Sequence, residues 1–308
     1  MLSRIGESLF WIGRYLERAD DTARILDVQL QVLVEDPSID EATSCEQLLQ
    51  VMGVDDYSGT VNRWTILDLL AHNPDSGTSI AAAIDAARES ARGARETLST
   101  DMWTAINTTW RGLPAARSKR APDLFAWVRN RAAMINGIAD STMTRDEGWN
   151  FFMLGRSIER VDMTARLLST AALAAGAQLA WPTTLRACGA YEAFIRAYRG
   201  LDGDRQAAEF LLLDRWFPRS VVSSLLEAER ALGRLEARGQ RSGFTDEAQR
   251  LLGRARTELE YRPLTEIIEE MPTEMERIQR SCAAASDAVS TRYFSRAESH
   301  AWTGGVLL

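Results

Sequence analysis

The sequence has few residues of the kinds that build metal centres and nucleophilic active sites. It contains three cysteines and two histidines, which are Cys45, Cys188, Cys282, His72 and His300. The cysteines are too widely spaced for a CxxC metal site or a framework of near-neighbour disulfides. A site with several histidine ligands, or a Ser-His-Asp triad with one histidine to spare, would draw on both histidines. We therefore expect free thiols, no metal ion and no cofactor.

Several other signatures are absent from the sequence. No P-loop, GxGxxG or HExxH motif occurs, so the sequence gives no sign of nucleotide or zinc-protease chemistry. No run of about 18 apolar residues is long enough to span a membrane, and charge interrupts the first residues before a signal-peptide core could form. The net charge of -7 argues against a surface built to bind nucleic acid. We expect a cytoplasmic protein with no membrane or nucleic-acid partner.

Helical patterns dominate the residues that are present. Hydrophobic residues make up 45% and charged residues 26% of the chain, a balance typical of a folded protein. Residues 79–98 and 220–238 carry apolar residues at spacings of three and four, whereas alternating strand patterns are scarce. The eight prolines are expected to mark helix junctions. The sequence predicts an all-α helical bundle.

One helical motif occurs twice. The segment FWIGRYLERADDTARIL begins at Phe10, and FMLGRSIERVDMTARLL begins at Phe152. Prolines at 37, 74 and 122 recur at 182, 218 and 263, an offset of roughly 145 residues that is far longer than a solenoid repeat. We therefore predict two tandem, related helical halves, residues 1–142 and 143–308, that pack as one body. A T-x-x-E capping box at Thr144 and Glu147 is expected to start the second motif helix.

Each motif places a polar stripe along the border of a buried helix face. Pairs within one helix, such as Asp20 with Arg24 or Arg14 with Glu17, would stabilise it by only about 0.2 to 0.5 kcal/mol. The stability of a single helix therefore does not explain the repetition. The first stripe is Gly13, Glu17, Asp20 and Arg24, the second is Gly155, Glu159, Asp162 and Arg166, and on the far side of the stripes lie Arg14, Arg18, Arg156 and Arg160.

The two motif glycines indicate a close approach of another backbone or a ligand. Glycine inside a helix costs roughly 1 kcal/mol relative to alanine, so Gly13 and Gly155 need a compensating contact. In the interpretation we favour, the two motif helices pack side by side and their Glu and Arg groups cross between the halves. In the alternative, the motifs line a groove where arginines bind carboxylate or phosphate groups and Glu17 and Glu159 bind an amine or act as acid or base.

Three further segments are candidates for ligand or partner contacts. The segment FPRS ends in Arg219 and Ser220, which could hold an anion at a helix entrance, although Ser220 as a plain N-cap accounts for it equally well. The basic segment PAARSKRAP, residues 114–122, could dock an acidic partner, but such segments are more often only solvated. Trp302 is the best candidate among the tryptophans for a partner contact.

The two GR..ER.D.TAR.L segments, with TRDEGW leading into the second, resemble the bacterial α-E family of α-helical domains with a shared Glu-Arg motif. Two other segments are similar to that family: FLLLDRWFPRSVVSSLLEAE from Phe210, and ILDLLAHNPDSGTSIAAAIDAARE from Ile66, which has a few extra residues around 75–78. The resemblance spans the whole chain and implies an all-α fold. Members of the family are typically encoded beside circularly permuted ATP-grasp-like proteins and transglutaminase-like proteins.

From this resemblance we expect a non-catalytic accessory or binding component of a peptide- or amide-forming system that works with an ATP-grasp-like ligase. Two alternatives remain. One is an enzyme in which Glu17 and Glu159 act as base or acid while Arg14, Arg18, Arg156 and Arg160 hold an anionic or amino-acid-like substrate. The other is a structural scaffold without a ligand. The sequence leaves both the enzymatic question and a homo-oligomeric state open.

Overall fold

The computed structural model of the protein describes residues 2–54, 57–173, 180–199, 203–236 and 243–294. These residues form α-helices, turns and two short π-helical segments, and no strand occurs among them. The all-α prediction is confirmed. No helix in the described ranges is both long enough and apolar enough to cross a membrane.

The helices before residue 143 surround one long central helix. This helix, α1, is the longest in the described part of the chain and carries the first Glu-Arg motif. The bounds are α1 Ser3–Glu35, α2 Glu41–Val51, α3 Arg63–Leu67, η1 Asp68–His72, α4 Ile80–Gly93, α5 Thr100–Arg117 and α6 Ala121–Thr142.

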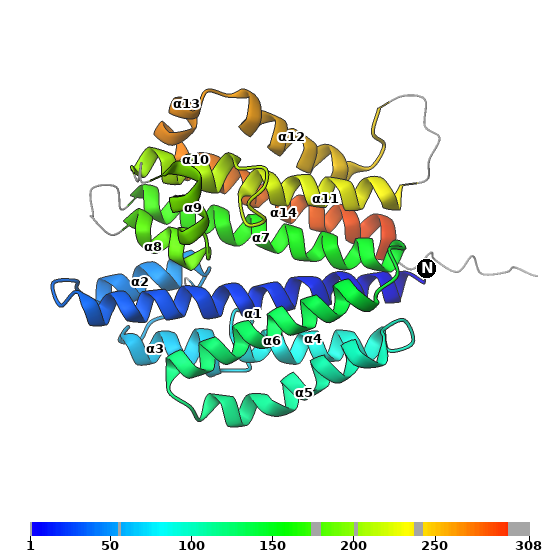
Figure 1. The fold of residues 1–308 in the computed structure, drawn as a ribbon, viewed down its shortest axis with the longest axis horizontal. Coiled ribbons are helices and arrows are strands. Elements are labelled where there is room, and N and C mark those ends of the chain that lie inside the picture. The colour runs from blue at the N-terminus through cyan, green and yellow to red at the C-terminus, as the bar shows by residue number, and fades with distance from the viewer. Residues whose placement is uncertain (1, 55–56, 174–179, 200–202, 237–242, 295–308) are drawn as a thin grey trace, which may run out of the picture.

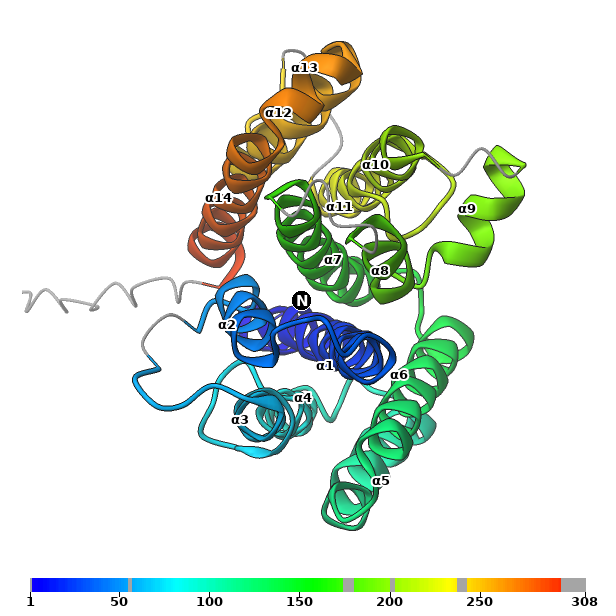
Figure 2. The same cartoon turned by 90° about the vertical axis from the view of Figure 1, so that its left-hand side faces the viewer.

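The helices after residue 143 are arranged around α7, which carries the second motif. The bounds are α7 Glu147–Leu173, α8 Ala180–Ala187, α9 Tyr191–Tyr198, α10 Asp204–Leu213, α11 Val221–Leu235, α12 Glu247–Tyr261, α13 Leu264–Glu269, α14 Met271–Val289 and η2 Ser290–Phe294. In Figure 1, α1 and α7 lie side by side across the middle, with α3 to α6 below them and α9 to α14 above. The end-on view in Figure 2 shows the same order around the two central helices.

Corresponding helices make corresponding contacts in the two sets. Helix α4 packs on α1 as α11 packs on α7, and α5 pairs with α6 as α12 pairs with α14. The loops before α4 and α11 also match. Ser79 Oγ donates to the Asn73 carbonyl (2.5 Å) and caps α4 at Ala82 N (2.9 Å), while Ser220 makes the same two kinds of bond to Asp214 and Ser223. A duplicated subdomain would make contacts of this kind, but the duplication itself and the division at 142/143 stay predictions.

The predicted cap of the second motif helix is wrong. Helix α7 begins at Glu147, and the Asp146 carboxylate accepts hydrogen bonds from the backbone amides of Gly148 (2.9 Å) and Trp149 (3.3 Å). Aspartate serves as an N-cap as well as threonine does, and here it stands at the right position while Thr144 lies two residues too early. The prediction of a junction at Pro114 is also wrong, because α5 continues past it to Arg117.

The hydrophobic core consists of two clusters, and each draws residues from both sides of residue 143. The first joins Leu9 and Phe10 of α1 to Phe152 of α7, together with the helices around α7. The second joins Leu26 of α1 to Met163 of α7, together with α2 to α6. Because burial of apolar side chains is the main stabilising contribution in folding, the described helices form one body.

Candidate functional site

The backbones of α1 and α7 touch where the two motif glycines lie. A Cβ atom on Gly13 would collide with the carbonyl oxygen of Phe152 and lie 3.2 Å from its carbonyl carbon. A Cβ atom on Gly155 would meet the carbonyl oxygen of Phe10 in the same way and lie 2.9 Å from its carbon. The two contacts are reciprocal, since Phe10 and Phe152 open the two copies of the motif. Only glycine permits this approach.

The Glu-Arg pairs cross between the two central helices. Glu159 accepts hydrogen bonds from Arg14 Nε (2.7 Å) and Arg18 Nε (2.6 Å), both on α1. Glu17 is bound in return by Arg156 Nε (3.2 Å) and by Arg160, both on α7. The Glu and Arg groups therefore cross between the two motif helices, as in the interpretation that we favoured. The predicted pair of Arg14 with Glu17 is wrong, because Arg14 reaches across to the other helix.

Both glutamates are completely buried. Glu17 is 0% and Glu159 1% exposed. Burial by itself would raise the pKa of Glu17, but Arg160, Arg219 and Arg156 outweigh it and hold that pKa far below its usual range. Burial would also raise the pKa of Glu159, but Arg14 and Arg18 outweigh it and lower that pKa. Both carboxylates therefore stay ionised and are weak bases.

The Asp-Arg pairs expected within each helix are confirmed. Arg24 Nε lies 3.1 Å from Asp20, and Arg166 Nε lies 2.8 Å from Asp162. Arg166 also donates to the carbonyl of Val51 at the end of α2 (3.1 Å). Arg166 thus ties α7 to α2, the helix that follows α1 in the sequence.

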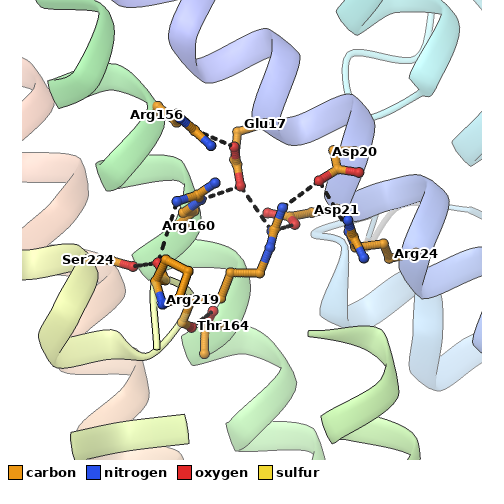
Figure 3. A network of polar contacts seen from close by, with 10 residues as sticks. Glu17, Asp20, Asp21, Arg24, Arg156, Arg160, Thr164, Arg219 and Ser224 are labelled. Atoms are coloured by element: carbon orange, nitrogen blue, oxygen red, sulfur yellow. Dashed lines mark hydrogen bonds and ion pairs between the residues drawn. The ribbon is translucent and has the colours of Figure 1, made fainter. Parts of the chain in front are cut away.

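Arg219 adds a third cation to the Glu17 side, and sequence reasoning had not placed it there. Its guanidinium reaches from the loop before α11 to Glu17 (2.9 Å), Asp20 and Asp21 (Figure 3). The loop is anchored on α7, because Thr164 Oγ1 donates to the Arg219 carbonyl (3.0 Å). Arg219 is thereby committed to carboxylates inside the protein, and the anion-site prediction gains no support. Ser220 is the N-cap of α11, the alternative that the sequence left open.

Asp21 is the other residue that sequence reasoning missed. It is buried, and burial together with the Glu17 and Asp20 carboxylates raises its pKa to about 7 against the lowering effect of Arg219. A signal was available in the comparison of the two motif copies, because the second copy has Met163 at this position. The loop before α4 likewise has Thr78 where the loop before α11 has Arg219. The additional acidic residue, Asp21, and the additional basic residue, Arg219, therefore occur together.

The three carboxylates on α1 have a geometry that a metal ion could use. Oxygen atoms of Glu17, Asp20 and Asp21 lie within 4.8 Å of one another. The Arg219 guanidinium already supplies a positive charge to all three. The expectation that the chain binds no metal stays a prediction, and this arrangement gives a reason for it.

The cysteines and His72 do not join this network as reactive groups. All three cysteines are free and buried, and burial raises the pKa of Cys45 to about 11 and that of Cys188 to about 12. A thiol with a raised pKa is a poor nucleophile at neutral pH. His72 lies at the end of η1, while His300 and Trp302 lie outside the described residues.

The model of the family called Alpha-E, described as a predicted alpha-helical domain with a conserved ER motif, matches residues 1–294. The chain belongs to the Alpha-E family. The crossed geometry gives its ER motif a physical meaning: in the two copies, Glu17-Arg18 and Glu159-Arg160, the glutamate of each binds the arginine of the other.

Relatives of the chain are known from mycobacteria. The uncharacterized proteins Mb2597 of Mycobacterium bovis and Rv2567 of Mycobacterium tuberculosis are each 28% identical to it over 252 residues, which cover 72% of this chain and 28% of theirs. The chain therefore spans under a third of the length of these curated relatives. No solved structure gives a significant match.

Proposed function

We propose that this chain is a non-catalytic binding component of a peptide- or amide-forming system in the cytoplasm, and that it works with an ATP-grasp-like ligase. One observation supports a non-catalytic role, which is that the motif glutamates have no free carboxylate oxygen. Both carboxylate oxygens of Glu17 and both of Glu159 are engaged by arginines, and neither side chain reaches solvent. A general base must lie within hydrogen-bond reach of the proton that it removes, and these two groups face only arginines.

The ligase part of the proposal comes from the family. Alpha-E proteins are typically encoded beside circularly permuted ATP-grasp-like and transglutaminase-like proteins, which are enzymes with chemistry of their own. The mycobacterial relatives are much longer than this chain, so the region they share with it is only one part of a larger protein. A helical module that works beside enzymatic domains is consistent with both facts.

The second candidate is a structural scaffold without a ligand. The ion pairs that fully engage Glu17 and Glu159 favour this candidate as well. The two candidates differ in what the chain binds. A binding component forms a specific complex with the ligase, whereas a scaffold of this kind contributes only its fold. The enzyme alternative requires Glu17 or Glu159 to be accessible, and their burial argues against it.

The test is reconstitution with an ATP-grasp-like ligase and a transglutaminase-like protein from the same genome. We expect the chain alone to turn over no ATP and form no amide, and to bind the ligase in a complex seen by size-exclusion chromatography with light scattering. Glu159→Gln should lower the melting temperature and leave ligase binding intact at a temperature where the variant is folded. Amide formation by the chain alone, or no complex with either enzyme, would overturn the proposal.

A further inference from the structure

Two adjoining cavities lie between the C-terminal half of α1 and helices α2, α7 and α8, on the left in Figure 1. The first has a volume of about 340 Å³ and the second, which α14 also lines, about 290 Å³. They adjoin because Gln47, Val51 and Thr170 line both, and we call the two together the α2–α7 cleft. Together they are within the range of ligand pockets, about 300 to 1,000 Å³.

The first cavity is mainly apolar. Its lining contains buried and half-buried aliphatic side chains from three helices, which are Ile25, Val28 and Val32 of α1, Leu48 of α2 and Leu167 of α7. An apolar group that enters this cavity leaves water, which is the main driving force of binding. One polar pair of the lining is satisfied within the protein, because Gln29 Nε2 donates to Ser44 Oγ (2.5 Å). The first cavity therefore suits an aliphatic side chain.

The two charged side chains among the described lining residues, Arg166 and Asp40, already have partners. Arg166 is paired with Asp162 (2.8 Å) and donates to the carbonyl of Val51 (3.1 Å). Asp40 accepts a hydrogen bond from the Thr43 amide (2.8 Å) as the N-cap of α2, where the positive end of the helix dipole offsets its charge. A charged ligand would lose its hydration here without gaining a free counter-ion. The cleft therefore favours an uncharged ligand.

Free amide groups surround the second cavity. Gln47 and Gln50 come from α2 and Gln279 from α14, and their side chains bond to no other described residue. Ser169 of α7 adds a hydroxyl that is unbonded in the same sense. Surface glutamines ordinarily bind water, but here three of them from two helices line a single cavity. A side-chain amide both donates and accepts, so it can pair with the N–H and the C=O of another amide.

We propose that the α2–α7 cleft binds a short, uncharged, peptide-like molecule. One aliphatic side chain of this ligand enters the first cavity, and the amide groups beside it pair with Gln47, Gln50 and Gln279 in the second. Apolar burial supplies affinity. The glutamines select for amides, because an apolar group in the second cavity would displace their water and leave them unpaired. The proposal goes beyond the proposed function and does not depend on which enzyme the chain works with.

The test uses N-acetyl-leucyl-leucine amide, an uncharged probe that carries aliphatic side chains and several amide groups. Its binding to the full folded chain is followed by NMR titration, and we expect a dissociation constant of about 1 mM or below. N-acetyl-leucyl-leucine, which has a free carboxylate, and leucyl-leucine amide, which has a free amine, should each bind at least about tenfold more weakly. The same two leucines within a longer Gly-Ser peptide should bind no more tightly.

Two substitutions test the two cavities separately. Val28→Phe fills the first cavity and should weaken binding of the uncharged probe at least about tenfold. Gln47→Ala removes an exposed amide that the fold does not use, so it should leave the chain folded and weaken binding about threefold or more. The matched control is Gln31→Ala, which removes an exposed glutamine of α1 that lines neither cavity and should leave binding unchanged.

Circular dichroism should show that each variant compared is folded, and Gln47→Ala decides the test if Val28→Phe does not fold. Equal binding of the charged and uncharged probes contradicts the proposal, as does no saturable binding of the uncharged probe. Wild-type affinity of Gln47→Ala contradicts it as well. Tighter binding of the longer peptide would overturn it in another way, because the ligand would then be a segment of a partner protein.

Discussion

Gly13 of α1 lies directly against the backbone carbonyl of Phe152 on α7, so closely that a Cβ atom at Gly13 would collide with it. The reciprocal contact places Gly155 against Phe10. This approach lets arginines of one helix reach the glutamate of the other. The glycines and the Glu-Arg pairs of the motif therefore act together to join α1 to α7.

The first prediction concerns this backbone contact. Gly13→Ala and Gly155→Ala should each lower the free energy of unfolding by about 3 kcal/mol, because a backbone carbonyl cannot move aside as a flexible side chain can. Gly137→Ala in α6 is the matched control, since nothing lies within 4 Å of a Cβ there. It should instead raise stability by roughly 0.5 to 1 kcal/mol. Urea unfolding measures all three, and equal effects at the three sites would rule out the close approach.

The second prediction concerns the motif carboxylates. Glu17→Gln and Glu159→Gln should each destabilise by about 3 to 5 kcal/mol, because each leaves buried arginines without their counter-ion. Glu247→Gln is the control, since its pair with Arg250 is half exposed and such pairs contribute only about 0 to 1 kcal/mol. Thermal and urea unfolding of the three variants provide the comparison. A small loss at both motif positions would mean that the crossed pairs do not hold the helices together.

The third prediction concerns pH. The pKa of Asp21 is about 7 in the folded chain and 3.8 is its ordinary value, so the folded state holds this proton more tightly than the unfolded state does. Its stabilising contribution is fully present below about pH 4 and is lost as pH rises through 7. The pKa values of Glu17 and Glu159 are lowered, so their contribution to the stability of the fold does not change with pH above 4.5, the ordinary pKa of glutamate.

The measurement is urea unfolding of the wild type and Asp21→Asn at several values between pH 5 and 8. The wild type should lose stability relative to the variant as pH rises across this range. Asp123→Asn, a change at an exposed residue, should follow the wild type. Parallel curves for wild type and Asp21→Asn would show that Asp21 does not titrate there.

The fourth prediction concerns Arg219, whose guanidinium is the counter-ion of the three carboxylates on α1. Arg219→Ala leaves Glu17, Asp20 and Asp21 facing one another without its charge, and carboxylate oxygens suit Mn²⁺. Millimolar MnCl₂ should then raise the melting temperature of Arg219→Ala by several degrees, because an ion that binds only the folded state stabilises it. The wild type should not respond, and Arg219→Ala with Asp21→Asn should respond less. An equal response of wild type and variant would show that Arg219 does not fill the site.

Much of the fold was predictable because it depends on local patterns. Periodic apolar residues predicted an all-α chain, and the spacing of Asp20 from Arg24 predicted a pair that the structure contains. The glycines inside the motif helices predicted a close approach, and the two copies suggested crossing between them. These inferences need only the geometry of a single helix and the cost of glycine within it.

The remaining features depend on contacts between distant segments. Arg14 has an acceptable partner three residues away in Glu17, and only the packing of α7 on α1 shows that Glu159 is the one it binds. Arg219 is about 200 residues from Asp20 and Asp21 in the sequence, so no spacing rule connects them. The differences between the copies, Met163 for Asp21 and Thr78 for Arg219, were the available clue.

The most direct test of the account is a pair of double-mutant cycles in urea unfolding. One couples Glu17→Gln to Arg160→Gln, a pair that crosses between the helices, and the other couples Glu17→Gln to Arg14→Gln on the same helix. We predict a coupling free energy of at least about 1.5 kcal/mol for the crossed pair and under about 0.5 kcal/mol for the pair within α1. The reverse order, with Glu17 coupled to Arg14 and independent of Arg160, would contradict the claim that the Glu-Arg motifs bind each other.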